Sequence, residues 1–191
     1  MTTWFTADHH FGHHNILSYT HRPYDDTDAM NRDLIRRWND TVAPDDVVWV
    51  LGDFALGTIA DTLPLAGALH GYKVLLAGNH DRCWAGHGAR ADAWTQRYLD
   101  AGFDEIRQGQ STMTIGDVDV LLCHFPYTGD SHDHDRFVDQ RPVDAGGWLL
   151  HGHVHEGWAQ RERMINVGVD VRDYRPISLA EVAALIAAGP A

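Results

Sequence analysis

Histidine is the residue type that stands out in this chain, with 14 histidines among 191 residues. They lie beside Asp, Asn and Gly and do not form one polyhistidine run. Imidazole nitrogens and carboxylate oxygens are common ligands of transition metals in proteins. The clustering therefore points to metal chemistry, and the spacing of individual residues indicates where it takes place.

Two pairs of residues have the spacing needed to hold one cation together. Asp8 and His10 stand two residues apart after an apolar run, and His153 and His155 repeat this spacing after another. In extended backbone, residues i and i+2 point to the same side. Asp8 and His10 can therefore bind one ion together, and His153 and His155 repeat the spacing.

Three further residues, Asp53, Asn79 and His124, each add one ligand atom after an apolar run of their own. Seven ligands exceed what one tetrahedral site uses, so two adjacent ions that share a carboxylate fit the set better. The mixture of carboxylate, amide oxygen and imidazole suits Mn, Fe or Zn better than Ca or Mg. Gly-Asp and Gly-Asn alone are common in turns, so the prediction depends on all the motifs occurring together.

The segments that precede these residues are predicted strands of an α/β protein. Five apolar runs lead directly into the polar clusters, at residues 2–7, 47–51, 73–77, 118–122 and 148–150. A further strand is expected at 165–169, a hairpin at 111–122, and helices at 26–42, 58–69, 91–101 and 178–188. Ligands of α/β sheets collect outside the carboxyl ends of the strands, so the clusters are expected to share one rim.

Length and composition limit the class of protein. A chain of 191 residues with 44% apolar residues suits one domain with a sizeable core, so we expect a single domain over 1–191. No apolar run approaches the ~20 residues of a membrane span, and no secretion signal is visible at the N-terminus. Two cysteines are too few for a disulfide framework, which favours a cytoplasmic location.

The motifs also resemble a known family. The blocks Asp8-x-His10, Gly52-Asp53, Gly78-Asn79-His80-Asp81, His124 and Gly152-His153-x-His155 are similar, in order, to the five signature blocks of the calcineurin-like metallophosphoesterases. Residues 8–16, 22–24 and 166–170 resemble a compact prokaryotic and phage branch of that family. The resemblance implies an α/β fold, a four-layer α/β/β/α sandwich, with a two-metal centre at one edge.

The same resemblance implies a role for each residue. One metal is expected on Asp8, His10 and His155, and the other on Asn79, His124 and His153, with Asp53 as the bridge. The implied cofactor is two divalent or trivalent ions, with Mn favoured and Fe, Zn and Ni as alternatives. The implied reaction is hydrolysis of phosphomono- or phosphodiester bonds by a metal-bridging hydroxide, with His80 assisting the leaving group.

The chain departs from the phosphoprotein phosphatases of this family at two positions. Those enzymes carry an Asp three residues after the bridging one and an Arg directly after it, where this chain has Leu56 and Gly57. A protein-phosphatase activity is therefore disfavoured. The carboxylate that orients His80 is unassigned, because Asp81 is only its neighbour in the sequence.

Three residues near the first motif are candidate substrate contacts: His13, Asn15 and Arg22. A guanidinium matches a phosphate with two parallel hydrogen bonds, which makes Arg22 the most interesting cation. The alternatives are a helix cap for Asn15 and an ion pair with Asp25 or Asp26 for Arg22.

The formal charge of −12 at pH 7 opposes binding of a long phosphate backbone. We therefore expect a small phosphate ester, such as a nucleotide or cyclic nucleotide, and no membrane partner. The oligomeric state stays open. The alternative is a nuclease or nucleic-acid end-processing enzyme of the same fold, which needs a basic face. Its candidate residues are Arg22, Arg32, Arg36, Arg37 and Arg82.

Overall fold

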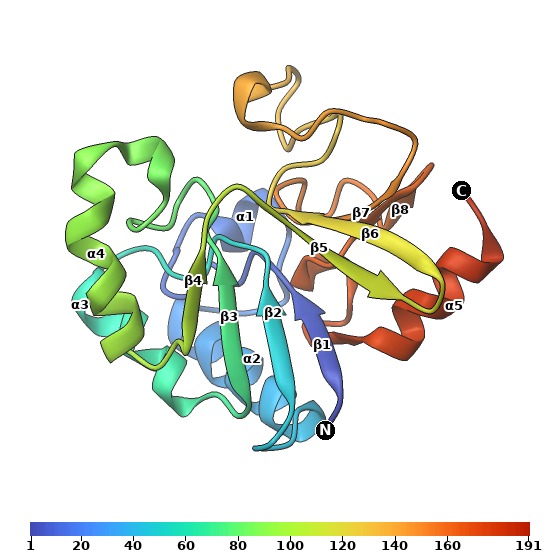
Figure 1. The fold of residues 1–191 in the computed structure, drawn as a ribbon. Coiled ribbons are helices and arrows are strands. Elements are labelled where there is room, and N and C mark those ends of the chain that lie inside the picture. Colours follow the sequence, from blue (N-terminus) through green and yellow to red (C-terminus); the bar gives the residue numbers. More distant parts are fainter.

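Two five-stranded sheets form the centre of the molecule, which a computed structural model describes over residues 1–191 (Figure 1). The first sheet has the order β10 (Ile177–Ser178), β1 (Thr3–Thr6), β2 (Val47–Val50), β3 (Tyr72–Leu76) and β4 (Glu105–Arg107). Strands β1 to β4 run parallel and β10 is antiparallel to β1. The carboxyl ends of β1, β2 and β3 therefore reach the same edge.

The second sheet has the order β5 (Gln110–Ile115), β6 (Val118–Cys123), β7 (Trp148–His151), β9 (Met164–Asn166) and β8 (Gln160–Arg161). Strands β5 and β6 form the predicted hairpin, and β6, β7 and β9 run parallel. The two sheets meet beyond β1, where Ala7 pairs with Gly168. This contact joins the strand ends of both sheets at one edge.

The core has two parts because both faces of the first sheet are buried. Phe5 and Leu76 of the first sheet pack with Leu122 and Leu150 of the second in a cluster between the sheets. The opposite face of the first sheet carries residues such as Val48, which belong to a second cluster together with the helices. Strands buried on both sides read as continuous apolar runs, which is why these segments are visible in the sequence.

Helix α2 (Thr27–Thr41) covers the outer face of the first sheet with Met30, Leu34 and Trp38. These residues are four apart and share one face of a helix. The helix begins where the Asp26 side chain accepts a hydrogen bond from the N–H of Ala29.

Short helices lie on the two flanks of the sheets (Figure 1). Helices α3 (Ile59–Thr62) and α4 (Ala89–Asp100) lie on one flank and α5 (Leu179–Ala188) on the other, with α1 (Ile16–Tyr19) after the first loop. The 3-10 helices are η1 (Leu63–Ala68), η2 (Ala85–His87), η3 (Val138–Gln140) and η4 (Val169–Val171). Two packed sheets with flanking helices confirm the predicted α/β sandwich. No helix has the length and apolar content to cross a bilayer.

Two predicted elements differ from the structure. The helix expected at 58–69 changes to a 3-10 helix at Leu63, because Pro64 has no N–H to donate and disrupts regular α-helical hydrogen bonding. The strand expected at 165–169 ends at Asn166, and a 3-10 turn begins at Val169. Neither difference moves a predicted ligand.

Candidate metal centre

The loops that follow the strands bring the predicted ligands together. The N–H of Asp8 donates to the carbonyl of Gly52 at 3.0 Å, and the N–H of His10 donates to the carbonyl of Asp53 at 3.1 Å. In the second sheet, the N–H of Gly152 donates to the carbonyl of His124 at 3.0 Å. These hydrogen bonds extend the pairing of neighbouring strands into the loops and fix the loops relative to one another.

The backbone at these positions is strained. Five of the predicted ligands have a left-handed conformation: Asp8 (φ 57°), His10 (φ 53°), Asp53 (φ 56°), His153 (φ 72°) and His155 (φ 47°). Such a conformation costs a non-glycine residue about 1–2 kcal/mol, and it persists only where the surroundings hold it. Its concentration in one rim marks that rim as a functional site.

Two glycines allow the loops to approach closely. A Cβ on Gly52 would lie 2.5 Å from Nδ1 of His124, and a Cβ on Gly78 would meet Oδ1 of Asp53. Gly52 also has φ of 91°, which side chains rarely tolerate. The glycines in the Gly-Asp and Gly-Asn motifs are therefore required by the packing of the site.

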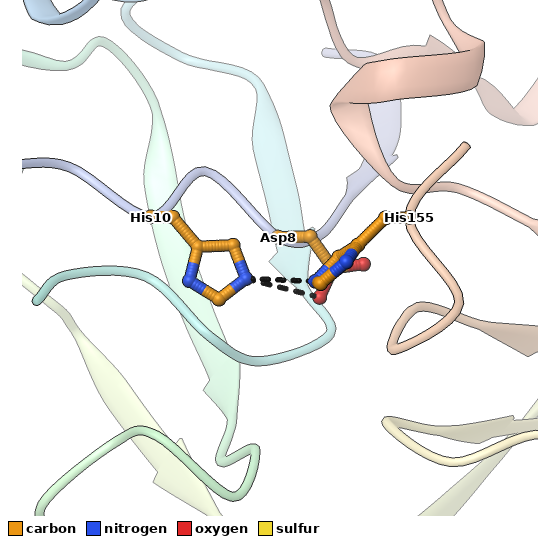
Figure 2. Close-up of side chains that lie close together, drawn as sticks. All are labelled: Asp8, His10 and His155. Carbon is orange, nitrogen blue, oxygen red and sulfur yellow. Dashed lines mark hydrogen bonds and ion pairs between the residues drawn. The ribbon is translucent and has the colours of Figure 1, made fainter. Parts of the chain in front are cut away.

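Asp8, His10 and His155 form the first donor cluster (Figure 2). The Nε2 atoms of His10 and His155 are 3.1 Å apart, and Oδ1 of Asp8 lies 4.0 Å from Nε2 of His10. That oxygen is buried and has no hydrogen-bond partner, whereas Oδ2 accepts from the N–H of His153 at 2.9 Å. An oxygen without a partner beside two imidazole nitrogens is a suitable position for a cation.

The imidazoles of this cluster are neutral near pH 7. Burial lowers the pKa of His155 to about 4, and burial together with the neighbouring His155 ring holds the pKa of His10 well below its usual range. Neutral imidazole is the form that binds metal ions.

Asp53, Asn79 and His124 form the second donor cluster. Nδ1 of His124 lies 2.8 Å from the carbonyl oxygen of Leu51, so this nitrogen donates to the backbone. Nε2 then faces Oδ1 of Asn79 at 3.1 Å and Oδ2 of Asp53 at 3.4 Å. A second ring nitrogen that donates to a carbonyl is the usual arrangement of a metal-ligating histidine.

The surroundings of His124 favour a positive charge on its imidazole, a condition that the neighbouring carboxylates impose. Burial disfavours the charged imidazole, but the Asp53 and Asp8 carboxylates outweigh burial and raise the pKa of His124 to about 9. A proton on Nε2 meets this condition when no ion is bound. A metal ion can replace that proton, because metal binding displaces protons from its ligands.

His153 lies beside the second cluster, with its ring centroid 5.2 Å from that of His124. Its Nε2 lies 2.9 Å from Oδ2 of Asp130, whose side chain is fully buried. Arg136 and Arg141 also bind this carboxylate, at 2.8 and 3.0 Å. These contacts anchor the segment 129–141 to the site.

The role of Asp130 could not be read from the sequence. It lies in the loop Gly129–Asp135, whose acidic and polar composition is typical of a solvent-exposed loop. Such exposure is found in the structure for His132 and His134, but not for the side chain of Asp130. Carboxylates that orient a ligating histidine recur in metal sites, but no local sequence pattern identifies them.

Comparison with known proteins identifies the family. Residues 13–181 match the model of the calcineurin-like phosphoesterase superfamily domain. The chain belongs to this superfamily. It is accordingly a metal-dependent phosphoric ester hydrolase.

Similar proteins occur in phages, archaea and bacteria. The chain is 34% identical to the gene 66 protein of Mycobacterium phage L5 over 88% of this chain and 86% of that protein. It is 27% identical to an uncharacterised protein of Methanocaldococcus jannaschii, over 97% of this chain and 92% of that one. A crystal structure of a protein of unknown function from Aquifex aeolicus superimposes with a TM-score of 0.72 and 26% identity, covering 96% and 98% of the two chains.

The predicted catalytic residue of this phosphoesterase, His80, is exposed beside the clusters. Its N–H donates to Oδ1 of Asp53 at 2.8 Å, and its ring lies 5.5 Å from that of His10. Asp81 does not orient this ring. Its carboxylate accepts instead from the N–H groups of Asp53, Phe54 and Gly78, at 2.9 to 3.1 Å.

The predicted substrate contacts differ in their positions. His13 is partly buried, with its ring centroid 5.5 Å from that of His10. Asn15 is exposed at the N-cap of α1, but its side chain makes no cap hydrogen bond. Both remain predictions as substrate contacts.

The geometry contradicts a substrate contact for Arg22. Its guanidinium is fully buried and binds Asp170 through Nε and Nη2, both at 2.8 Å. It also donates to the carbonyls of Asp8 and His9, both at 2.7 Å, and to the sulfur of Met30. No N–H is left for a phosphate. Arg22 forms a buried ion pair that holds the ligand loop, with Asp170 as its partner and not Asp25 or Asp26.

Replacing Arg22 with methionine is expected to lower the free energy of unfolding by about 3–5 kcal/mol, because Asp170 is left buried without a partner. Urea denaturation measures the change. The double variant Arg22→Met/Asp170→Leu, which removes both charges, should recover much of the loss. A residue that only contacts substrate would leave the unfolding free energy unchanged.

Proposed function

We propose that the chain hydrolyses phosphomono- or phosphodiester bonds with a two-metal centre. One observation carries the proposal: Oδ2 of Asp53 lies 3.9 Å from Nε2 of His10 and 3.4 Å from Nε2 of His124. These nitrogens belong to separate donor clusters. A single carboxylate oxygen between two clusters is the arrangement expected of a bridging ligand.

The charge balance supports bound cations. Burial, the largest influence, raises the pKa of Asp8 to about 8, and the nearby Asp53 carboxylate adds to the effect. Two carboxylates so close together in a buried site require compensating positive charge to ionise together. Carboxylate, amide and imidazole donors suit Mn, with Fe, Zn and Ni as alternatives.

In this proposal, Asp8, His10 and His155 hold one ion, and Asn79, His124 and His153 hold the other. Asp53 contacts both. Asp130 accepts a hydrogen bond from Nε2–H of His153, which leaves Nδ1 as the nitrogen free to bind. Asp130 is thus a positioning residue for the second ion.

The bound ions would activate a water nucleophile near neutral pH and neutralise the charge that develops on the phosphoryl group. The side chains of the protein orient the reacting groups and supply a proton to the leaving group. His80 is exposed and fixed by its backbone to Asp53, so its imidazole can protonate the departing alkoxide. The Asp81 carboxylate accepts hydrogen bonds from the N–H groups of Asp53 and Gly78. It thereby keeps the Asp53 and Asn79 loops at a fixed separation.

We further propose a small phosphate ester, such as a nucleotide or cyclic nucleotide, as substrate. Three of the five arginines named for a nucleic-acid face are buried or paired with carboxylates. Arg22 is buried, and Arg36 and Arg37 pair with Asp33 along α2. Paired arginines contribute little to the attraction of a phosphate backbone, which supports a small substrate over a nuclease.

Treatment with a chelator tests this function. We expect removal of metal to abolish hydrolysis of bis(4-nitrophenyl) phosphate and of 4-nitrophenyl phosphate, and Mn²⁺ to restore at least one of the two. Release of nitrophenolate is measured before and after metal addition. Failure of Mn²⁺, Fe²⁺, Zn²⁺ and Ni²⁺ alike to restore hydrolysis would contradict the proposal.

A further inference from the structure

A basic pocket lies outside the ligand set, between the loop after β3 and the first turns of α4. Arg82, His87, Arg90 and Trp94 line this pocket, which has a volume of about 260 Å³. Sites that enclose a whole small-molecule ligand typically measure about 300–1,000 Å³. This pocket, called the Arg82 pocket, is therefore large enough for one chemical group of a ligand but too small for a whole ligand.

The arginines of this region are positioned by stacking and not by ion pairs. The guanidinium carbons of Arg82 and Arg97 lie 4.7 and 4.5 Å from the ring centroid of Trp94. A stacked guanidinium keeps its N–H groups free at the edge, where they can bind an anion. Trp94 thus holds two arginines in place without neutralising them.

Neither Arg82 nor Arg90 has a carboxylate within 4.0 Å, and their side chains donate no hydrogen bond inside the protein. Arginines elsewhere, such as Arg107 and Arg175, pair with a glutamate at 2.7 and 3.0 Å. The acidic residues nearest in the sequence are Asp81, whose carboxylate accepts from backbone N–H groups, and Asp92, in the first turn of α4. Neither pairs with these arginines. Other arginines, such as Arg32 and Arg161, also lack a carboxylate partner, but Arg82 and Arg90 line one pocket together, and this concentration of unneutralised charge favours an anionic ligand.

The pocket lies next to the proposed reaction centre. Arg82 follows His80 by two residues, so their Cα atoms are at most about 7.6 Å apart. On the other side, a chain of aromatic contacts connects the pocket to a ligand. His87 packs on Trp84 at 5.3 Å between ring centroids, Trp84 on Phe125 at 5.9 Å, and Phe125 on His153 at 5.0 Å. The pocket is thus connected both to His80, through the chain, and to the proposed ligand His153, through aromatic contacts.

We propose that the Arg82 pocket binds a second phosphate group of the substrate, so that the preferred substrates are nucleotide esters with a phosphate besides the one hydrolysed. Guanidinium groups recognise phosphate through paired, charge-assisted hydrogen bonds. This inference rests on the proposed function, because it assigns a substrate class to the same site.

A matched pair of esters tests the pocket. The probes are thymidine 5′-(4-nitrophenyl phosphate) and the same ester with an additional 3′-phosphate, assayed with the Mn²⁺-loaded full chain. Since hydrogen bonds to charged groups contribute about 1.5–3 kcal/mol, we expect the 3′-phosphate to lower KM about ten-fold or more. The double variant Arg82→Gln/Arg90→Gln should bring the ratio of the two KM values close to one.

The control variant is Arg161→Gln. Arg161 also stacks on a tryptophan, with its guanidinium carbon 5.3 Å from the Trp158 ring centroid, but it lies on β8 in the other sheet. It should keep the wild-type ratio. Equal KM values for the two esters in the wild type, or a preference that survives the double substitution, would overturn the proposal.

A binding measurement separates failure of the pocket from failure of the proposed function. Calorimetric titration with thymidine 3′,5′-bisphosphate and thymidine 5′-monophosphate requires no turnover. Tighter binding of the bisphosphate that the double variant loses supports the pocket even when neither ester is hydrolysed. Equal affinity for both nucleotides rejects the pocket, whether or not the chain hydrolyses bis(4-nitrophenyl) phosphate.

Discussion

Replacing Asp53 with asparagine is expected to remove both metal ions and, with them, hydrolysis. Oδ2 of Asp53 lies near a histidine nitrogen of each donor cluster, and an amide lacks its negative charge. The other oxygen, Oδ1, accepts from the N–H of His80, and asparagine can preserve this contact. The loop should thus remain in place while both sites weaken. Metal content per chain is measured after dialysis against a low concentration of Mn²⁺.

Asp130→Asn is the matched comparison, because it changes an aspartate to asparagine beside only one ion. Loss of a carboxylate that orients a metal ligand typically lowers metal affinity about 10–100-fold. We expect this loss at the second site alone, so calorimetry should resolve one weakened and one unchanged binding event. An Asp53→Asn variant that retains one ion with wild-type affinity would contradict the bridging role.

Replacing His80 with alanine is expected to lower the rate about 10²–10⁴-fold for esters with a nucleoside or alkyl leaving group, which corresponds to loss of a general acid. The effect should be much smaller for 4-nitrophenyl esters, because nitrophenolate leaves without a proton. His80 is not a member of either donor cluster, so the metal content should remain at two ions per chain.

The comparison of leaving groups distinguishes proton donation by His80 from a role of His80 in metal binding. His14→Ala serves as the control, since His14 is exposed in a neighbouring loop and has no assigned role. An equal loss of rate for both kinds of ester, or a loss of bound metal in the His80 variant, would contradict the assignment of His80 as proton donor.

The convergence of the candidate ligands could be predicted from the sequence because the fold is regular where they stand. Apolar runs followed by Asp, Asn or His mark the carboxyl ends of parallel strands, and the ends of neighbouring parallel strands meet. Asp8, Asp53 and Asn79 follow β1, β2 and β3, which are adjacent in the first sheet. Their convergence could therefore be deduced without knowledge of the loops.

The residues that support the ligands could not be predicted in this way. Asp170 is 148 positions from Arg22, and Asp130 is 23 positions from His153. Asp130 lies in an irregular loop and Asp170 in a three-residue 3-10 helix, and neither segment is long enough for a periodic pattern that predicts which side chain turns inward. The guanidinium of Arg22 is chemically suited to either a phosphate or a carboxylate. Its sequence context could not show that the side chain is buried, and so could not show which of the two it binds.

Short edge strands were missed for a different reason. Strands β8 and β10 each contain only two residues, which is too short for an alternating pattern. The pairing of β10 with β1 is set by the path of the chain before α5, which is a tertiary feature.

The ligands of each donor cluster come from both sheets. Asp8 follows a strand of the first sheet and His155 follows a strand of the second, and Asp53 and His124 repeat this division. An ion held by such a set would act as a further crosslink between two layers that are joined by apolar side chains and by hydrogen bonds such as that from the N–H of Val169 to the carbonyl of Ala7. The free energy of metal binding would then add to the free energy of unfolding of the two-sheet sandwich. Catalysis and the stability of this edge would therefore depend on the same ligand atoms.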